Sequence, residues 1–298
     1  MAPATRTVRG YWGVLPDMRA SAVHAAVAVA GRLGLPGADP VVLADGANVI
    51  VRLSPSPVVA KVAASTAVIR PDVAGSLQRE LDVARFLTAA GAPALAPAPE
   101  VPPVVHRHAG RVMSFWRYAG RSDGPPPGED AIGTMLRDLH QVLRGYPAPL
   151  TTLAPLDDIP AFLARPLTVL GDRDRAALTA AHARLSAALT ADSPAGQVLH
   201  GDAGAGNLMR TGAGWIWHDF EDVCRGPAAW DVAAATASPR LSRARVLAAY
   251  GDPVDPVQLD VCEQLRRLHL TVWYALYAER LPQHRQRAAE LLAAWPAP

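Results

Sequence analysis

The sequence has 298 residues, of which 50% are hydrophobic and 19% charged, enough for a sizeable core in one large domain or two lobes. The formal net charge is only +2, and no block of like charges stands out, so we expect no nucleic-acid partner. No apolar run reaches the ~18 residues that a membrane-spanning helix needs. Cys224 and Cys262 lie far apart and form no CxxC metal or redox pattern. We therefore expect a cytoplasmic protein without a membrane partner.

The first part of the chain has the pattern of a small β-rich region that follows one helix. In chain order we expect a helix at 16–33, short strands at 41–44, 49–53 and 58–63, a helix at 76–90, a Pro-rich loop at 93–103 and a strand at 111–118. The second and third strands are separated by Ser54-Pro55-Ser56-Pro57, which predicts a hairpin with a four-residue loop.

The rest of the chain is mostly helical in its pattern. After a Gly/Pro-rich break at 120–128 we expect helices at 131–143 and 172–189, a turn-rich β region at 198–200, 207–210 and 215–220, and further helices from 229, over 257–281 and over 282–294. This order predicts an α+β fold of two lobes. The smaller, β-rich N-lobe would comprise residues 1–117, and the larger, mainly helical C-lobe residues 118–298.

The segment HGDAGAGN, residues 200–207, carries the first chemical signal. His200, Asp202 and Asn207 stand in the spacing H-x-D-x-x-x-x-N. Phosphoryl transfer needs a carboxylate to orient the attacking hydroxyl and accept its proton, and oxygen ligands for Mg²⁺. Asp202 suits the first task, and the amide of Asn207 the second. A match this short also fits a simple polar turn between strands.

A second acidic signal follows twelve residues after Asn207. Asp219 ends an apolar, β-type run, and a carboxylate at a strand end can hold a hard cation such as Mg²⁺. Glu221 or Asp222 would either support a second metal or substrate group, or lie in a solvated turn. His218 has no ligand-spaced His or Cys partner, which favours a packing or hydrogen-bonding histidine.

Lys61 is the only lysine among the 29 basic residues of the chain. Its ammonium is a compact point charge that suits a crowded phosphate site better than the planar fork of arginine. Glu80, on the helix expected next, would form the strand-lysine and helix-glutamate pair of a kinase. The alternatives are a solvent-facing lysine and an ordinary exposed glutamate. The turn at 45–48 could cover a nucleotide, but a single glycine, Gly46, is a weak signal.

Together these residues resemble the aminoglycoside phosphotransferase / choline kinase family, which has a protein-kinase-like fold. The resemblance spans residues 20–235 and is most specific in VLHGDAGAGNLM at 198–209, WHDFED at 217–222 and GPAAWDVA at 226–233. Looser matches are Gly46-Ala47-Asn48, Ala60-Lys61-Val62, Gln78-Arg79-Glu80 and Leu136-Arg137-Asp138-Leu139-His140.

The resemblance implies a role for each site residue and implies ATP and Mg²⁺ as cofactors. Asp202 would be the catalytic base, Asn207 and Asp219 the metal ligands, Lys61 the phosphate clamp and Glu80 its partner, with His200 and Asp231 as structural braces of the catalytic loop. Gly46, Asn48 and Lys61 would contact the nucleotide, and the strand Met113–Tyr118, including Trp116 and Tyr118, would hold adenine through its backbone.

The chain departs from the family pattern inside the catalytic loop. Ala203-Gly204-Ala205-Gly206 replaces a bulky apolar residue followed by His-Pro, which either loosens the loop or makes room for a larger acceptor. Arg225-Gly226-Pro227 also replaces the more usual Gly-Asp-Pro, a change for which we have no functional account.

The sequence leaves the acceptor open. A polycationic aminoglycoside calls for a dense acidic patch, but the acidic residues of the C-terminal helices alternate with arginines, including Arg266, Arg267 and Arg280. The aromatic residues Trp273, Tyr274 and Tyr277 fit a buried core better than a pocket. We therefore expect an ATP-dependent phosphotransferase acting on a small-molecule hydroxyl, either of an antibiotic or of a sugar or amino-alcohol metabolite.

Two other functions stay open at this point. The chain could be a nucleotide-binding pseudokinase or regulatory module, or, less in keeping with Lys61 and Glu80, a metal-dependent phosphoester hydrolase. The choice between ATP and GTP is also open. We expect a monomer or a weak homodimer.

Overall fold

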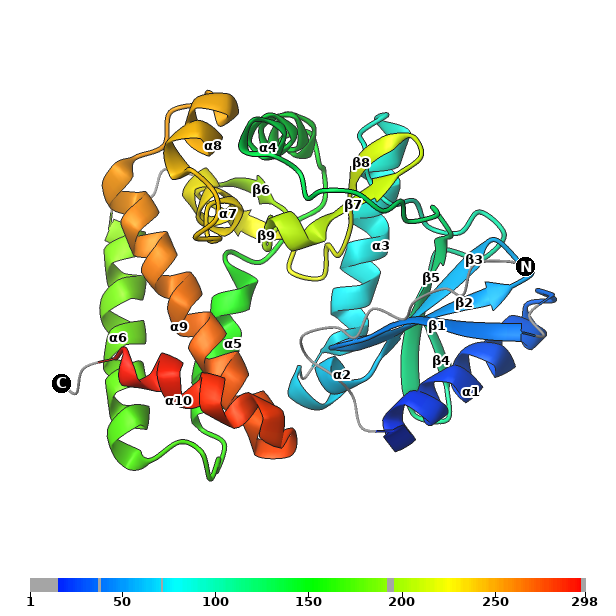
Figure 1. Cartoon of the computed structure of the whole chain (residues 1–298), viewed down its shortest axis with the longest axis horizontal. Helices are drawn as coiled ribbons and strands as arrows, with labels where there is room; N and C mark the ends of the chain where they lie inside the picture. Colours follow the sequence, from blue (N-terminus) through cyan, green and yellow to red (C-terminus); the bar gives the residue numbers. More distant parts are fainter. Residues whose placement is uncertain (1–15, 37–38, 71, 192–195, 296–298) are drawn as a thin grey trace. The chain divides into compact units, whose positions relative to one another are not determined.

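The computed structural model describes residues 16–36, 39–70, 72–191 and 196–295. They form two compact units, which we call the β-rich unit (Met1–Ser122 with Arg210–Glu221) and the helical unit (Asp123–Met209 with Asp222–Pro298). The α+β class predicted from the sequence is confirmed (Figure 1). Residues 210–221, which include Asp219, belong to the β-rich unit although the chain on both sides of them belongs to the other.

The β-rich unit is built on a five-stranded antiparallel sheet of order β1-β2-β3-β5-β4 (Figure 1). Its elements are α1 (Pro16–Arg32), β1 (Asp39–Asp45), β2 (Asn48–Ser54), β3 (Val58–Ala63), α2 (Ser65–Ile69), α3 (Val73–Ala89), β4 (His106–His108), β5 (Arg111–Arg117) and β8 (Gly214–Trp217). The predicted hairpin is present, since β2 pairs with β3 in register from Asn48↔Ala63 to Arg52↔Val59.

The central strand β3 is buried along all six residues because helices cover both faces of the sheet. Val58, Ala60 and Val62 pack in one cluster with the Ala-rich side of α1. Val59 and Ala63 point to the opposite face, where α3 packs. Because side chains alternate along a strand, Lys61 also points to the α3 face, where a charged residue must find partners away from water.

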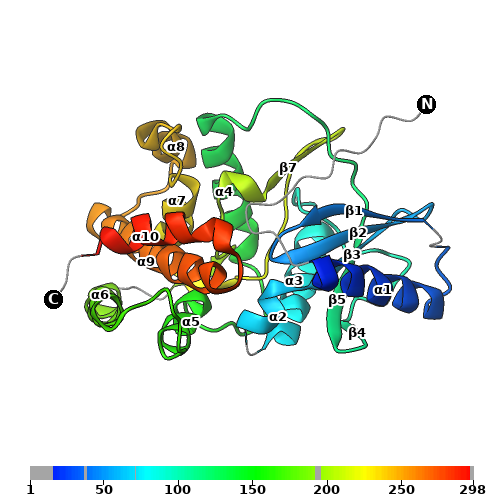
Figure 2. The same cartoon turned by 60° about the horizontal axis from the view of Figure 1, so that its bottom comes forward.

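The helical unit holds the long helix α9 against four others. Its elements are α4 (Glu129–Leu143), α5 (Ala154–Leu163), α6 (Asp172–Ala191), β6 (Gln197–Leu199), η1 (Ala205–Asn207), β9 (Cys224–Gly226), α7 (Ala228–Ala235), α8 (Arg243–Tyr250), α9 (Pro256–Arg280), η2 (Pro282–His284) and α10 (Arg285–Ala293). Helix α9 packs against α5, α6, α7 and α10, and α4 packs against α8 and α7 (Figure 2). Strand β7 (Leu208–Thr211) then leads the chain into β8.

Most expected elements are present, and those that the sequence missed are short or contain proline. They are α2, β4, α5, β9 and α8. Pro155 and Pro160 lie within α5, where proline normally argues against a helix, and β4 and β9 have only three residues each. The helix expected over 282–294 is divided into η2 and α10. In the described part of the chain, no helix combines the length and apolarity needed to cross a membrane.

Helices α4 and α8 approach so closely that one position has no room for a side chain. A Cβ atom added to Gly133 would lie less than 3 Å from the backbone of Val246 and Tyr250 and from Cβ of Ala249. Gly31, by contrast, lies in α1 with nothing within 4 Å of an added Cβ.

We predict that Gly133→Ala lowers the free energy of unfolding by about 1–3 kcal/mol, since α4 and α8 must separate to admit the methyl group. The matched variant Gly31→Ala should leave stability unchanged or raise it by up to about 1 kcal/mol, because alanine favours a helix over glycine. Urea denaturation followed by circular dichroism measures both. Equal stability of the two variants would contradict the close helix contact.

Candidate functional site

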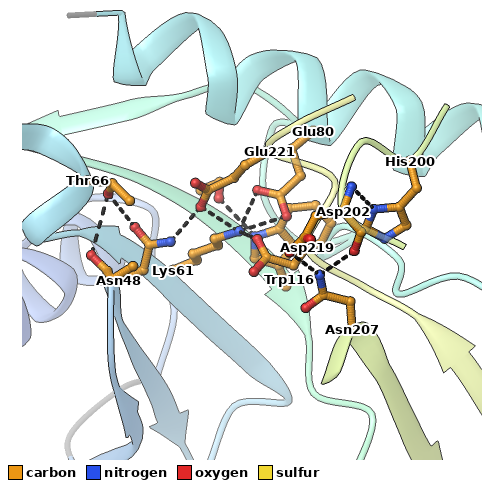
Figure 3. A network of polar contacts seen from close by, with 12 residues as sticks. Asn48, Lys61, Thr66, Glu80, Trp116, His200, Asp202, Asn207, Asp219 and Glu221 are labelled. Atoms are coloured by element: carbon orange, nitrogen blue, oxygen red, sulfur yellow. Dashed lines mark hydrogen bonds and ion pairs between the residues drawn. The ribbon is translucent and has the colours of Figure 1, made fainter. Parts of the chain in front are cut away.

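In the β-rich unit, the predicted site residues gather around Lys61 (Figure 3). Its Nζ atom lies 2.8 and 2.9 Å from the two carboxylate oxygens of Glu80 and 2.6 Å from Oδ1 of Asp219. A third carboxylate, that of Glu221, lies 2.7 Å away. The predicted strand-lysine and helix-glutamate pair is therefore formed, between β3 and α3, and the acid after β8 joins it.

Glu221, which the sequence left undecided, is buried and bonded to several groups. Asn48 Nδ2 donates to Oε1 of Glu221, and Arg70 Nη1 lies 3.4 Å from Oε2. The hydroxyl of Thr66 donates in turn to Oδ1 of Asn48 over 2.7 Å. Glu221 thus connects Lys61 to the first residue of β2 and to the end of α2, and it is not solvated.

The cluster contains more acidic than basic side chains. Lys61 and Arg70 face Glu80, Asp219 and Glu221, so three carboxyl groups and two basic groups share a largely buried place. Burial together with the carboxylates of Glu221 and Asp219 raises the pKa of Glu80 to about 8, although Lys61 opposes this. Burial alone would lower the pKa of Lys61, but the three carboxylates raise it. A further cation at this cluster would stabilise the ionised form of Glu80, which burial and the neighbouring carboxylates disfavour.

A divalent cation fits the donors of this cluster. Glu80, Asp219 and Glu221 can each offer a carboxylate oxygen, with these oxygens within 4.8 Å of one another. Hard oxygen donors of this kind suit Mg²⁺. Asp219 is the accessible member, with a side chain 41% exposed against 2% for Glu80 and 7% for Glu221. Its backbone has φ of 67°, in the left-handed region that aspartate tolerates better than most residues.

In the helical unit, the buried Asp231 of α7 holds the backbone of the HGD segment. Its carboxylate accepts the N–H of His200 at 2.7 Å and that of Gly201 at 2.9 Å. Its Oδ2 also lies 3.0 Å from Nε2 of His140, whose Nδ1 lies 2.9 Å from the hydroxyl of Tyr250. An ionised carboxylate can only accept hydrogen bonds, so Nε2 of His140 donates to Asp231. Burial raises the pKa of Tyr250 to about 12.

Gly201 is required by the shape of this loop. Its φ is +86°, and an added Cβ would collide with the carbonyl of Asp222. The indole N–H of Trp230 donates to the carbonyl of Gly201 over 2.8 Å. Together with Asp231, these contacts fix the residue immediately before Asp202.

Asp202 points out of the braced loop with its side chain 45% exposed. Asn207 Nδ2 donates to Oδ2 of Asp202 at 3.0 Å and to its backbone carbonyl at 2.7 Å, so the amide oxygen of Asn207 is directed elsewhere (Figure 3). Arg266 of α9 donates from Nη2 to Oδ1 of Asp202. The sequence did not anticipate this arginine contact.

The Ala-Gly-Ala-Gly interior of the loop is folded by its own backbone. Gly204 N–H donates to the carbonyl of Asp202 at 2.8 Å, and Asn207 N–H donates to that of Gly204 at 2.9 Å. Ala203 is completely buried, and residues 205–207 form the 3₁₀ turn η1. Two hydrogen bonds therefore close the loop around small residues.

The residues expected to contact the nucleotide lie in the β-rich unit. Asn48 is largely buried by its bonds to Glu221 and Thr66, whereas Gly46 has open space beside its Cα. Trp116 is buried in β5, with its indole N–H donating to Ser114. The N–H of Tyr118 donates to the carbonyl of Pro57 over 2.7 Å, and Arg52 lies over its ring.

Each unit thus brings together its own share of the predicted residues. Lys61, Glu80 and Asp219 meet in the β-rich unit, and His200, Asp202, Asn207 and Asp231 meet in the helical unit. Functional contacts that the sequence analysis missed come from Thr66, Arg70, His140 and Arg266. Of these four residues, only His140 could have been found in the sequence, because it lies in the LRDLH segment that matches the family. The other three belong to no motif.

The brace by Asp231 makes a prediction about stability and pH. Burial alone would raise the pKa of Asp231, but the hydrogen bonds and neighbouring rings of His140 and His200 lower it below its usual 3.8. A carboxylate with a lowered pKa stabilises the folded state above its unfolded pKa, and this contribution is lost as pH falls through the lower, folded value. Acid should therefore release the loop brace.

We predict that Asp231→Asn lowers the free energy of unfolding by about 2–4 kcal/mol at neutral pH, because the new amide group places a donor against backbone N–H donors. The loss of wild-type stability below about pH 4 should be correspondingly weaker in the variant. Asp255→Asn, which alters the exposed N-cap of α9, is the control and should cost at most about 1 kcal/mol. Urea titrations from pH 3 to 7 measure the free energy of unfolding. If the variant lost as much stability as wild type below about pH 4, Asp231 would not act as the brace.

Comparison with known proteins identifies the family of the chain. Residues 41–260 match the model of the phosphotransferase enzyme family. No curated protein matches the chain significantly.

Solved structures resemble the chain at low sequence identity. A microcompartment-associated aminopropanol kinase has a TM-score of 0.65 at 17% identity, covering 90% of this chain and 94% of its own. An amicoumacin kinase solved with AMP-PNP and Ca²⁺ has a TM-score of 0.62 at 12% identity, covering 95% and 89%. APH(2″)-IIIa with GDP and kanamycin has a TM-score of 0.56 at 15% identity, covering 86% and 92%. The chain therefore has the kinase-like fold and belongs to the phosphotransferase enzyme family.

Proposed function

We propose that the protein transfers the γ-phosphate of ATP to a hydroxyl group of a small molecule, with Asp202 as the base. The observation that carries this proposal is the buried Lys61, held by Glu80 and in contact with the accessible Asp219. A lysine buried for structural reasons needs one carboxylate partner, not three. A site that binds phosphates and a metal cation needs a positive group for the phosphates and negative groups for the cation.

Lys61 would bind the phosphates of the nucleotide. An ammonium group has three N–H donors, and here three carboxylates surround it. A phosphate oxygen can be accepted only if one carboxylate gives way. Asp219 is the most exposed of the three, so we propose that it leaves Lys61 when the nucleotide binds, while Glu80 keeps the lysine in place.

Asp219 and Asn207 would hold Mg²⁺, with Glu221 as a further candidate ligand. When bound, the cation would neutralise the phosphate charge that the transferred group and ADP carry. Asp219 contributes a half-exposed carboxylate, and Asn207 contributes its amide oxygen because its amide nitrogen is engaged by Asp202. The backbone of Met113–Tyr118 would hold adenine, with Gly46 leaving space beside the phosphates.

Asp202 would orient the acceptor hydroxyl and take its proton. Arg266 and Asn207 each occupy one of its carboxylate oxygens, and each oxygen can still accept a second hydrogen bond. Because Asp231 and Trp230 fix the neighbouring backbone, the carboxylate is held in place before the acceptor arrives. Preorganisation of this kind lowers the barrier to transfer.

A nucleotide-binding pseudokinase is the second candidate, and one contact favours it. Arg266 already bonds Asp202, and an arginine that stayed there throughout would weaken its use as a base. Turnover distinguishes the two functions, because both would bind Mg·ATP.

We predict that Asp202→Asn lowers kcat for ADP release with an acceptor by about 100- to 10,000-fold, because proton transfer to the base is lost. Binding of Mg·ATP should change by less than about threefold, since the nucleotide does not rely on this carboxylate. Asp138→Asn, an exposed residue of α4, is the control and should keep full activity. A coupled ADP assay over a panel of hydroxyl acceptors measures the rate. Nucleotide binding with no turnover in wild type would favour the pseudokinase.

We also predict that Asp219→Asn removes most of the Mg²⁺-dependent part of the stabilisation that AMP-PNP gives. A ligand that binds only the folded state stabilises it in proportion to the logarithm of its concentration over Kd. Melting temperatures with and without MgCl₂ measure this for wild type and variant. Asp82→Asn, a half-buried position of α3 bonded only to Gln78 in the described network, is the control. The same Mg²⁺ effect in wild type and Asp219→Asn would exclude Asp219 as a ligand.

A further inference from the structure

Arg266 is fixed beside the carboxylate of Asp202 from three directions. Its Nη2 donates to Asp202 and its Nη1 to the carbonyl of Gly201, the latter at 3.1 Å. Its guanidinium lies over the ring of Trp230, 5.0 Å from the centroid. The side chain is only 19% exposed. A planar cation held by a carboxylate, a carbonyl and an aromatic face has little freedom to move away.

The side of α9 that carries Arg266 continues with apolar and aromatic residues. Leu270, Trp273 and Tyr277 follow at intervals of four, seven and eleven residues, which places them on the same side of the helix. Leu270 is 37% exposed, Trp273 is half-buried with its ring in edge contact with Phe162, and Tyr277 is buried. Beyond Arg266, this face offers apolar contact and no carboxylate.

The acidic residues of α9 are engaged elsewhere. Glu263 pairs with Arg243 and Asp260 accepts a hydrogen bond from the side chain of Gln264. Glu279 accepts from the backbone and hydroxyl of Thr168. A polycationic acceptor would therefore find the guanidinium of Arg266 beside Asp202, paired with that carboxylate, and no further acidic patch along this helix face.

We infer that Arg266 is a specificity-determining residue, which restricts the acceptor to hydroxyl compounds with no positive charge next to the reacting hydroxyl. This inference rests on the proposed function, because it assumes that the hydroxyl approaches Asp202. An ammonium group one or two bonds from that hydroxyl would lie close to the guanidinium, where like charges repel strongly in a partly dehydrated site. A hydroxyl or carboxylate in the same place would be tolerated or attracted. The acceptor class is thus neutral or anionic.

A purely structural Arg266 would behave differently from a selective one. If the residue only holds Asp202, its loss should slow transfer to every acceptor by the same factor. If it also selects by charge, its loss should change the ratio between acceptors. The ratio, not the rate, is the decisive quantity.

Three matched alcohols test the ratio in wild-type protein with Mg·ATP: 1-amino-2-propanol, 1,2-propanediol and 3-hydroxybutyrate. They share a secondary hydroxyl and differ in the charge of the group beside it. We expect kcat/KM for the cation to be at least about tenfold below that for the diol in wild type, and within about twofold of it in Arg266→Gln. Arg266→Lys, which retains the charge, should keep the discrimination. Arg267→Gln removes a charge from the adjacent, exposed position and should behave as wild type.

A binding measurement makes the inference independent of turnover. Calorimetric titration of kanamycin into the protein with Mg·AMP-PNP should show binding at least about tenfold tighter for Arg266→Gln than for wild type. Equal affinities, a wild-type preference for the cationic alcohol, or equal losses for all three alcohols would overturn the inference. If no alcohol is phosphorylated although Mg·ATP binds, the proposed kinase function fails, and the kanamycin comparison still decides the role of Arg266. If Arg266→Gln does not fold, the order of the three alcohols in wild type decides it.

Discussion

The buried ammonium of Lys61 is the constraint on which the β-rich unit depends. Strand β3 is covered on both faces, so a charge at its centre can be kept only if other segments bring carboxylates to it. Helix α3 brings Glu80, and the turn after β8 brings Asp219 and Glu221. The cost of burying one cation thus determines which segments must converge, and the three acidic side chains that meet there are a donor set that could hold a metal ion.

The helical unit also contains a buried charged residue, here a carboxylate. Asp231 is completely buried and is satisfied by two backbone N–H groups and His140. Because two partners of this carboxylate are main-chain N–H groups of the loop that carries Asp202, it fixes the path of that loop. In each unit an inner residue is buried and rigid, Glu80 or Asp231, and an outer carboxylate, Asp219 or Asp202, is left accessible. A site for group transfer requires both: buried residues that hold the structure in place, and accessible groups that can reach the ligands.

How well the sequence predicted the structure depended on how local the signal was. The α+β class, the β2–β3 hairpin and the long helices were predicted correctly because their apolar periodicity lies within one segment. The pairing of Lys61 with Glu80 followed from an established strand-and-helix pattern. Arg70 and Arg266 could not be found in this way, since 28 arginines look alike in the sequence and only tertiary packing distinguishes them. Helix α5 was missed because its prolines argue against a helix when read alone.

The return of residues 210–221 to the β-rich unit has a consequence for modularity. A fragment ending near residue 122 would contain Lys61 and Glu80 but lack two of the three carboxylates that surround the lysine. A fragment starting near residue 123 would carry an apolar hairpin whose partners Pro93 and Leu95 were left behind. Neither half is a contiguous building block. Recombination between relatives should therefore preserve function only when residues 210–221 and the first 122 residues come from the same parent protein.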